Sequence, residues 1–336
     1  MTRATRLRSV PARGRARPHS TAGRGRCLLC GRRGRWGEVL SDRLRDEPAG
    51  RFRVVRCGGC EHAQLSPLPS AREDRAFYAA DRQTKNIMGS VQVDLERRKA
   101  GADTRRRLAL LTRTCAPGSA RVLDVGSGYG FFVDAAVVAG YDAVGLDPSD
   151  ERIAQARTGC RGTLLHGVLN AAFAKRWAGA FGWVLMSHVV EHVADPVGCL
   201  RLARRLLAPG GALVVEAPNL DDALLAEAPA YRAFYWQRAH LSYFDPAGLS
   251  SAFRRAGWAT VRMRGVQRYG LRNLLHWLDQ ARPQLERPEY ETAEPLLQGL
   301  EARYKAGRER ALTCDTLIAV AQVPGRRGRA LRVRRR

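Results

Sequence analysis

The stretch Asp124-Val125-Gly126-Ser127-Gly128-Tyr129-Gly130 decides the fold, because three glycines alternate with other residues directly after a short apolar segment, Arg121–Val125. Glycine has no Cβ, so a backbone with alternating glycines can turn tightly and let a ligand approach closely. The apolar segment Tyr129–Ala139 that follows predicts a helix, whose first turn offers unpaired N–H groups and the positive end of a dipole. We therefore expect a strand, a ligand-binding loop and a helix in succession.

Alternation of strands and helices continues after this loop and predicts an α/β fold with a mostly parallel, doubly wound sheet. Two insertions interrupt it, at about 220–245 and 266–312, before a last apolar strand at Thr316–Val323. The further predicted elements are the strands Ala143–Leu146, Thr163–Leu165, Trp183–Ser187, Ala212–Ala217 and Thr260–Met263, and the helices Asp150–Arg157, Pro196–Leu207 and Ala247–Arg255.

Composition along the chain predicts five segments. A basic tail, 1–22, precedes a cysteine-containing unit at 23–70, which holds short strand-like stretches at Trp36–Leu40 and Phe52–Arg56. A helical linker or lid is expected at 71–118. The main α/β domain spans 119–323, and a second basic tail occupies 324–336.

The net charge of +25 suggests a nucleic-acid binder at first, but much of the excess lies in the two ends, Met1–Arg26 and Gly325–Arg336, which contain no acidic residue. These ends are either solvated tails or a patch that binds nucleic acid or a membrane surface. No window reaches the ~18–20 apolar residues of a spanning helix. The N-terminus lacks the apolar region of a secretory signal, and eight cysteines in 336 residues are too few for a disulfide scaffold. We expect a cytoplasmic protein.

The loop spacing argues against a dinucleotide. In Gly-x-Gly-x-x-Gly the third glycine would fall on Phe131, whereas Gly130 comes one residue earlier. Asp124, directly before the loop, suits an ammonium group better than a pyrophosphate. Asp147, which ends the second strand, is placed to accept both hydroxyls of a ribose.

Four segments together resemble class I S-adenosylmethionine-dependent methyltransferases, over about residues 100–323: Arg121–Gly130, the strand that ends in Asp147, Ser187–His192, and Leu207–Gly211 followed by Glu216–Asn219. The resemblance implies a seven-stranded sheet with one antiparallel strand and S-adenosylmethionine as cofactor. No adenine contact is assigned, because His166–Asn170 lacks the acidic residue that such enzymes often place there. The cofactor-binding residues implied are Asp124, Gly126, Ser127, Gly128, Gly130, Asp147 and Ser187.

Two pairs of cysteines, Cys27-x-x-Cys30 and Cys57-x-x-Cys60, flank the strand-like stretches of the N-terminal unit. This spacing is typical of a four-cysteine zinc ribbon, whose closed site stabilises folding and has no open position for catalysis. A degenerate site, or a redox or iron–sulfur site, is the alternative. The unit resembles the zinc ribbon of some bacterial sugar C-methyltransferases, although rRNA guanine methyltransferases with zinc ribbons also exist.

The segment after the fourth strand supplies the candidate catalytic residues His188, Glu191 and His192, with His240 and Tyr243 in the insertion that covers the acceptor in related enzymes. A histidine or carboxylate here could deprotonate an acceptor. A divalent metal is a second interpretation, because similar Glu-x-x-Glu-His segments with a later histidine bind one in ubiquinone-pathway and small-RNA 2′-O-methyltransferases. His188 replaces the first glutamate of that pattern. A purely structural role is the third.

We expect a methyltransferase that acts on a hydroxyl or carbon of a small molecule, such as a sugar or secondary metabolite. One alternative is an RNA methyltransferase that holds phosphate with its ribbon and arginine-rich tails. The other is an inactive zinc-ribbon binding module that kept the fold.

Overall fold

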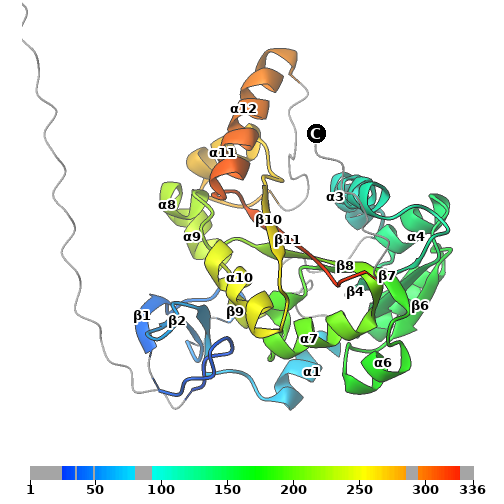
Figure 1. Ribbon diagram of the computed structural model, residues 1–336. Coiled ribbons are helices and arrows are strands. Elements are labelled where there is room, and N and C mark those ends of the chain that lie inside the picture. The colour runs from blue at the N-terminus through cyan, green and yellow to red at the C-terminus, as the bar shows by residue number, and fades with distance from the viewer. Residues whose placement is uncertain (1–24, 35, 48–49, 80–92, 285–293, 326–336) are drawn as a thin grey trace, which may run out of the picture.

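The computed structural model describes residues 25–34, 36–47, 50–79, 93–284 and 294–325, which two β-sheets organise (Figure 1). The predicted basic tail at 1–22 and most of the one at 324–336 lie outside these ranges. One sheet has seven strands and the other has four.

The seven-stranded sheet has the order β10-β11-β8-β7-β4-β5-β6. The strands from β8 to β6 run parallel, whereas β11 is antiparallel to both β8 and β10. The predicted mostly parallel, Rossmann-like sheet with one antiparallel strand is therefore confirmed. Its strands are β4 (Arg121–Val125), β5 (Ala143–Asp147), β6 (Thr163–His166), β7 (Phe181–Ser187), β8 (Leu207–Pro218), β10 (Val261–Val266) and β11 (Thr316–Gln322).

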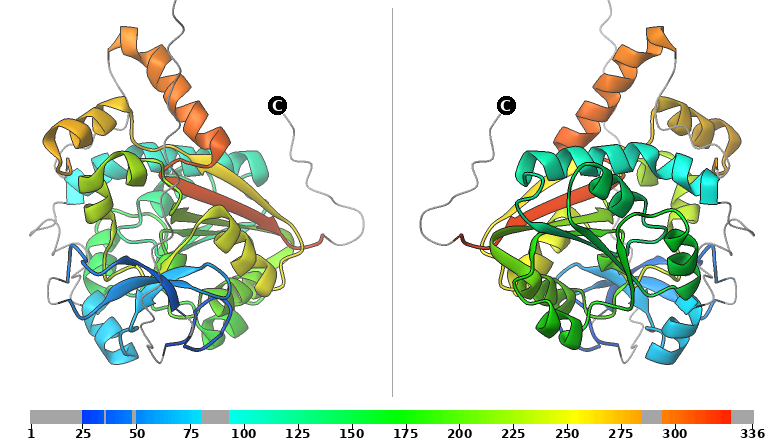
Figure 2. Two further views of the ribbon diagram at one scale, coloured as in Figure 1. Left: turned by 90° about the vertical axis from the view of Figure 1, so that its left-hand side faces the viewer. Right: turned by 90° about the vertical axis from the view of Figure 1, so that its right-hand side faces the viewer.

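Helices cover both faces of this sheet (Figure 2). Strand β7 has apolar side chains on both faces that need to be covered. Val184 and Met186 belong to one hydrophobic core, whereas Trp183 and Leu185 belong to another. Alternate residues of a strand point to opposite faces, so a strand buried on both sides reads as a continuous apolar run. The first core includes residues of α6 (Ala171–Arg176), α7 (Pro196–Leu206) and α10 (Pro246–Arg255), and the second includes residues of α3 (Val93–Thr114), α4 (Phe131–Val138) and α5 (Asp150–Arg157).

Most boundaries differ from the prediction by only a few residues, and two of the differences have a clear local cause. The helix expected from Tyr129 begins at Phe131, because Gly130 precedes it in the left-handed conformation with φ 72°. Strand β8 begins at Leu207 rather than Ala212, and its pairing with β7 shifts register across Pro209-Gly210-Gly211. These residues form an irregular start to the strand. The short helix α6, capped by Asn170, was not predicted.

The four-stranded antiparallel sheet joins the cysteine-containing unit to the first insertion of the α/β domain. Strands β1 (Trp36–Ser41), β2 (Arg53–Cys57) and β3 (Ala63–Ser66) come from the unit, and β9 (Ser242–Tyr243) pairs with β3 from the insertion. The sequence predicts the first two strands but neither β3 nor β9. A shared core packs Phe52 and Leu65 against Trp236 and Tyr243.

The two insertions are largely helical. The first contains α8 (Leu224–Glu227) and α9 (Pro229–Tyr235), and the second contains α11 (Leu271–Gln280) and α12 (Pro295–Ala311), which project from the body of the molecule in Figure 1. Within the predicted linker or lid, α1 (Ala71–Ala79) precedes α3. Among the residues described, no helix combines the length and the apolar character that crossing a membrane requires.

Candidate functional site

The implied cofactor residues meet at the carboxyl edge of the seven-stranded sheet. Asp124 of β4 lies opposite Gly145 of β5 on one side and Leu185 of β7 on the other. Because these strands are parallel, the residues that follow them emerge at one edge, where open α/β sheets bind their ligands. The structure thus brings the glycine loop, Asp147 and Ser187 together.

The glycine loop has the backbone that its sequence predicts. Gly126, Gly128 and Gly130 all have positive φ angles, of 75°, 54° and 72°. A Cβ on Gly126 would lie 2.5 Å from Val189 Cγ2, whereas a Cβ on Gly128 would meet nothing within 4 Å. The Asp147 carboxylate accepts hydrogen bonds from Gly128 N at 2.8 Å and Ser149 N at 2.9 Å. Asp147 therefore holds a loop with open space beside Gly128.

Asp124 is a buried carboxylate for which no hydrogen bond or ion pair is found among the described residues. Burial raises the pKa of Asp124 to about 7, against a lowering influence of Arg107. A carboxylate in this state gains from a cationic partner. Its surroundings therefore fit the α-ammonium group of S-adenosylmethionine, the cofactor that the resemblance implies.

Glu216 is a site residue that the sequence analysis did not single out. It lies near the end of β8, fully buried, and receives hydrogen bonds from Arg107 Nε at 2.8 Å, Arg106 Nη2 at 3.1 Å and Ser187 Oγ at 3.0 Å. Burial alone would raise the pKa of Glu216, but the two arginines lower it to about 2. This cluster ties α3 to the sheet edge. The one feature of the sequence that could have identified Glu216 as a site residue is its position near the end of a predicted strand.

His188 begins the candidate catalytic segment with an unusual backbone, since its φ of 54° lies in the left-handed region that a residue with a Cβ rarely adopts. Its Nδ1 lies 3.3 Å from Glu191 Oε1, and its Nε2 lies 3.3 Å from Arg268 Nη1. A guanidinium can only donate, so Nε2 accepts and Nδ1 donates to Glu191. Both ring nitrogens of His188 are therefore engaged.

Glu191, His192 and His240 form a compact cluster in which one ligand atom of each lies within 4.8 Å of the others. Glu191 is 1% exposed, and its Oε2 has no hydrogen-bond partner among the described residues. His192 donates Nδ1–H to Ala239 O at 2.8 Å, which leaves Nε2 as an acceptor. Burial lowers the pKa of His192, and that of His240 further, so both imidazoles are neutral near pH 7. A carboxylate with two neutral imidazoles fits either a proton acceptor or a divalent metal.

A pocket of about 400 Å³ lies beside this cluster. Four of the five candidate catalytic residues line it, together with the aromatic side chains Tyr231, Phe234, Tyr269 and Trp277. The fifth, Tyr243, is not among the lining residues. It is 2% exposed, and its hydroxyl donates to Gln237 O at 2.8 Å and accepts from Gln237 N at 3.0 Å.

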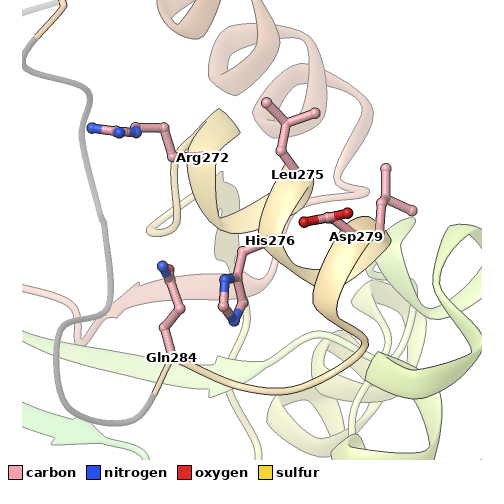
Figure 3. Close-up of a pocket in the computed structure, with 6 residues that line it drawn as sticks. Arg272, Leu275, His276, Asp279 and Gln284 are labelled. Carbon is pink, nitrogen blue, oxygen red and sulfur yellow. The ribbon is translucent and has the colours of Figure 1, made fainter.

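A second hollow, of about 590 Å³, lies along α11 (Figure 3). It is lined by Arg272, Leu275, His276, Leu278, Asp279 and Gln284, none of which was assigned to the site. We place the functional site in the smaller pocket, because only that pocket contains the predicted residues and adjoins the sheet edge.

The four predicted zinc ligands come together in the N-terminal unit. Cys27 Sγ lies 3.6 Å from Cys60 Sγ, and Cys30 Sγ lies 3.7 Å from Cys57 Sγ. All four sulfur atoms lie within 4.8 Å of one another, and none forms a disulfide. A tetrahedral zinc site with Zn–S bonds of ~2.3 Å requires S···S distances of about 3.8 Å. The cysteines therefore fit one zinc ion.

Comparisons with known proteins bear on the family to which the chain belongs. Residues 95–262, half of the chain, match the family model described as a methyltransferase domain. A ubiquinone biosynthesis O-methyltransferase of Caulobacter sp. is 35% identical over 122 residues, 34% of this chain and 48% of that protein. One from Methylococcus capsulatus is 33% identical over 156 residues, 44% of this chain and 66% of that protein.

The matched region thus spans about half to two thirds of these curated relatives. Among solved structures, a SAM-dependent methyltransferase from Archaeoglobus fulgidus is similar with a TM-score of 0.48 and 17% identity, over 72% of this chain and 99% of that one.

Proposed function

Because the chain belongs to the methyltransferase domain family, we propose that it transfers the methyl group of S-adenosylmethionine to a hydroxyl or carbon of a small molecule. The observation that carries this proposal is the convergence of Asp124, the glycine loop and Asp147 with Glu191 and His192 at one sheet edge. S-adenosylmethionine supplies a methyl group already activated on a sulfonium. The protein then has to bind the cofactor and the acceptor, orient them toward each other and exclude water.

The cofactor would be held by groups with matching charge and shape. Asp124 pairs with the ammonium group of the cofactor. The glycine loop lets the cofactor approach the backbone closely, because its glycines have no Cβ. Asp147 keeps free lone pairs beyond its two backbone hydrogen bonds, and these accept the ribose hydroxyls. Two serines complete this part of the cofactor site, Ser127 and Ser187. The buried Oγ of Ser127 has no hydrogen-bond partner among the described residues.

Deprotonation of the acceptor falls to the Glu191–His192 pair. His192 Nε2 is the proton acceptor of this ring because Nδ1 donates to Ala239 O, and Glu191 Oε1 lies 3.9 Å from Nε2, where it would stabilise the imidazolium. His188 orients Glu191 through its Nδ1. A divalent metal held by Glu191, His192 and His240 is the second reading of the same cluster, and it would acidify an acceptor hydroxyl instead.

Two observations support a small-molecule acceptor with a hydroxyl group. Aromatic side chains form part of the pocket wall, and the volume of the pocket is that of a small-molecule site. The relatives are named as O-methyltransferases, which also favours a hydroxyl. A structural zinc ion bound by Cys27, Cys30, Cys57 and Cys60 would stabilise the N-terminal unit. Recognition of RNA by the basic tails remains the alternative, and these tails lie outside the described residues.

The proposal is tested by following methyl-labelled S-adenosylmethionine in the presence of separated small-molecule and RNA fractions. We expect S-adenosylhomocysteine to form only with the small-molecule fraction, and ribonuclease to leave the rate unchanged. Label transferred to RNA would replace this proposal with the RNA alternative. Absence of transfer together with absence of cofactor binding would favour an inactive binding module.

A further inference from the structure

One residue of the N-terminal unit, Arg45, lines the pocket of the α/β domain. It lies in a tight turn between β1 and β2, where Leu44 and Glu47 form a β-bridge. Two hydrogen bonds fix the turn against the first insertion, from Arg45 N to Trp236 O at 3.0 Å and from Arg238 N to Asp46 Oδ1 at 2.6 Å. The position of the guanidinium is therefore set by the docking of the two parts.

All the contacts that the Arg45 guanidinium makes are with uncharged groups. Nη1 donates to Phe234 O at 3.2 Å, Nη2 donates to Gln237 Oε1 at 2.7 Å, and the group lies 4.1 Å from the centre of the Phe234 ring. No carboxylate of the described residues lies within 4.0 Å of it. Burial lowers the pKa of Arg45, and the charge of Asp46 acts against this lowering without contacting the guanidinium.

The two other cations of the pocket differ in this respect. Lys99 Nζ lies 3.1 Å from Glu96 Oε1, and Arg268 Nε lies 2.9 Å from Asp103 Oδ2. Both charges are therefore balanced within the protein. A buried cation is costly unless an anion compensates it, so the unbalanced charge on Arg45 is available to a ligand.

Gln237 connects this charge to the candidate catalytic cluster. Because the guanidinium can only donate, the amide oxygen of Gln237 faces Arg45 and its Nε2 faces His240 Nε2, at 2.9 Å. The His240 ring in turn lies 4.9 Å from the His192 ring, centre to centre. Arg45 is thus two hydrogen bonds from His240, so a group bound to Arg45 would be connected to the cluster through Gln237.

We propose that Arg45 binds a carboxylate or phosphate group of the acceptor, whose flat apolar part packs against the rings of Phe234, Tyr231 and Trp277. The planar guanidinium presents paired donors that match either anion. This inference rests on the proposed function and names the chemical class of its substrate. It also gives the cysteine-containing unit a direct part in substrate selection.

The test measures binding of benzoate, phenyl phosphate and the neutral analogue benzamide by calorimetry, in the presence of saturating S-adenosylhomocysteine. A charge-assisted hydrogen bond contributes about 1.5–3 kcal/mol, so we expect one of the anions to bind ~10-fold or more tightly than benzamide. The stronger of the two anions identifies the preferred group. Arg45→Gln should bind all three probes equally. The matched control, Arg51→Gln, removes the same charge from the exposed pair of Arg51 with Glu73 and should behave as wild type.

Equal binding of the three probes by wild type, or an anion preference that survives in Arg45→Gln, would overturn the inference. If Arg45→Gln does not fold, Arg45→Lys replaces it in the test, because lysine keeps the charge but loses the paired donors. We expect Arg45→Lys to bind the anions at least ~3-fold more weakly than wild type. Anion binding as tight as that of wild type would overturn the inference. Binding of S-adenosylhomocysteine itself reports on the proposed function separately. A protein that binds it without preferring anions fails only the assignment of Arg45.

Discussion

Replacing Glu216 with glutamine removes the charge at the centre of the ion cluster that joins α3 to β8. The pKa of Glu216 is lowered from 4.5 to about 2 in the folded protein. A group with a lowered pKa stabilises the folded state above its unfolded pKa, and this contribution is lost as the pH falls toward the folded pKa. A lowering of this size corresponds to about 3 kcal/mol at pH 7 and about 1 kcal/mol at pH 3. Removing one partner of a buried ion pair costs a similar ~3–5 kcal/mol.

We therefore expect Glu216→Gln to lower the free energy of unfolding by about 3 kcal/mol at pH 7, with the difference from wild type narrowing by about 2 kcal/mol at pH 3. Urea unfolding followed by tryptophan fluorescence measures this, because several of the six tryptophans, Trp183 among them, are buried in the folded protein. The control is Asp142→Asn, which breaks the pair with Arg121 between side chains that are 57% and 39% exposed and should cost less than about 1 kcal/mol. Equal costs for the two variants, or a difference that does not change with pH, would refute the reasoning.

Three further predictions concern the loop, the metal and the catalytic cluster. Gly126→Ala, with φ 75° and a Cβ placed 2.5 Å from Val189 Cγ2, should cost about 1–3 kcal/mol in stability and weaken cofactor binding; an unchanged melting temperature and affinity would contradict the tight packing. The purified protein should contain one zinc ion per chain by elemental analysis, and Cys57→Ser should lose it; a full complement of zinc in that variant would exclude the four-cysteine site. His192→Ala should lower turnover ~10²-fold or more at unchanged cofactor affinity, and loss of both together would indicate a structural role.

Much of the fold could be predicted, because its determinants are local. The apolar strand and the glycines from Arg121 to Gly130, Asp124 near the end of β4 and Asp147 at the end of β5 are all encoded within short stretches. Strand β9 could not be predicted, because two residues carry no periodicity. It forms only because Ser242 and Tyr243 meet β3 across the chain.

Site residues at the ends of strands could be predicted from the sequence. Site residues that are positioned by contacts between distant parts of the chain could not. Glu216 lies near a strand end, but its partners Arg106 and Arg107 come from a helix about 110 residues earlier. Arg45 gave no signal, because arginine is abundant throughout this sequence and its contacts lie 189 and 192 residues away. Tyr243 is a predicted site residue that does not line the pocket. Its position near His240 in the sequence suggested contact with the acceptor, but its hydroxyl forms hydrogen bonds with the backbone of Gln237.

The most direct test of the central claim is a calorimetric titration of wild type and Asp147→Ala with S-adenosylmethionine. We expect wild type to bind one equivalent, and the variant to bind ~10- to 100-fold more weakly, because it loses hydrogen bonds from the ribose to a charged carboxylate and the anchor of the Gly128 amide. Equal affinity in the two proteins would contradict the role of Asp147. Absence of binding by wild type would contradict the proposed activity itself.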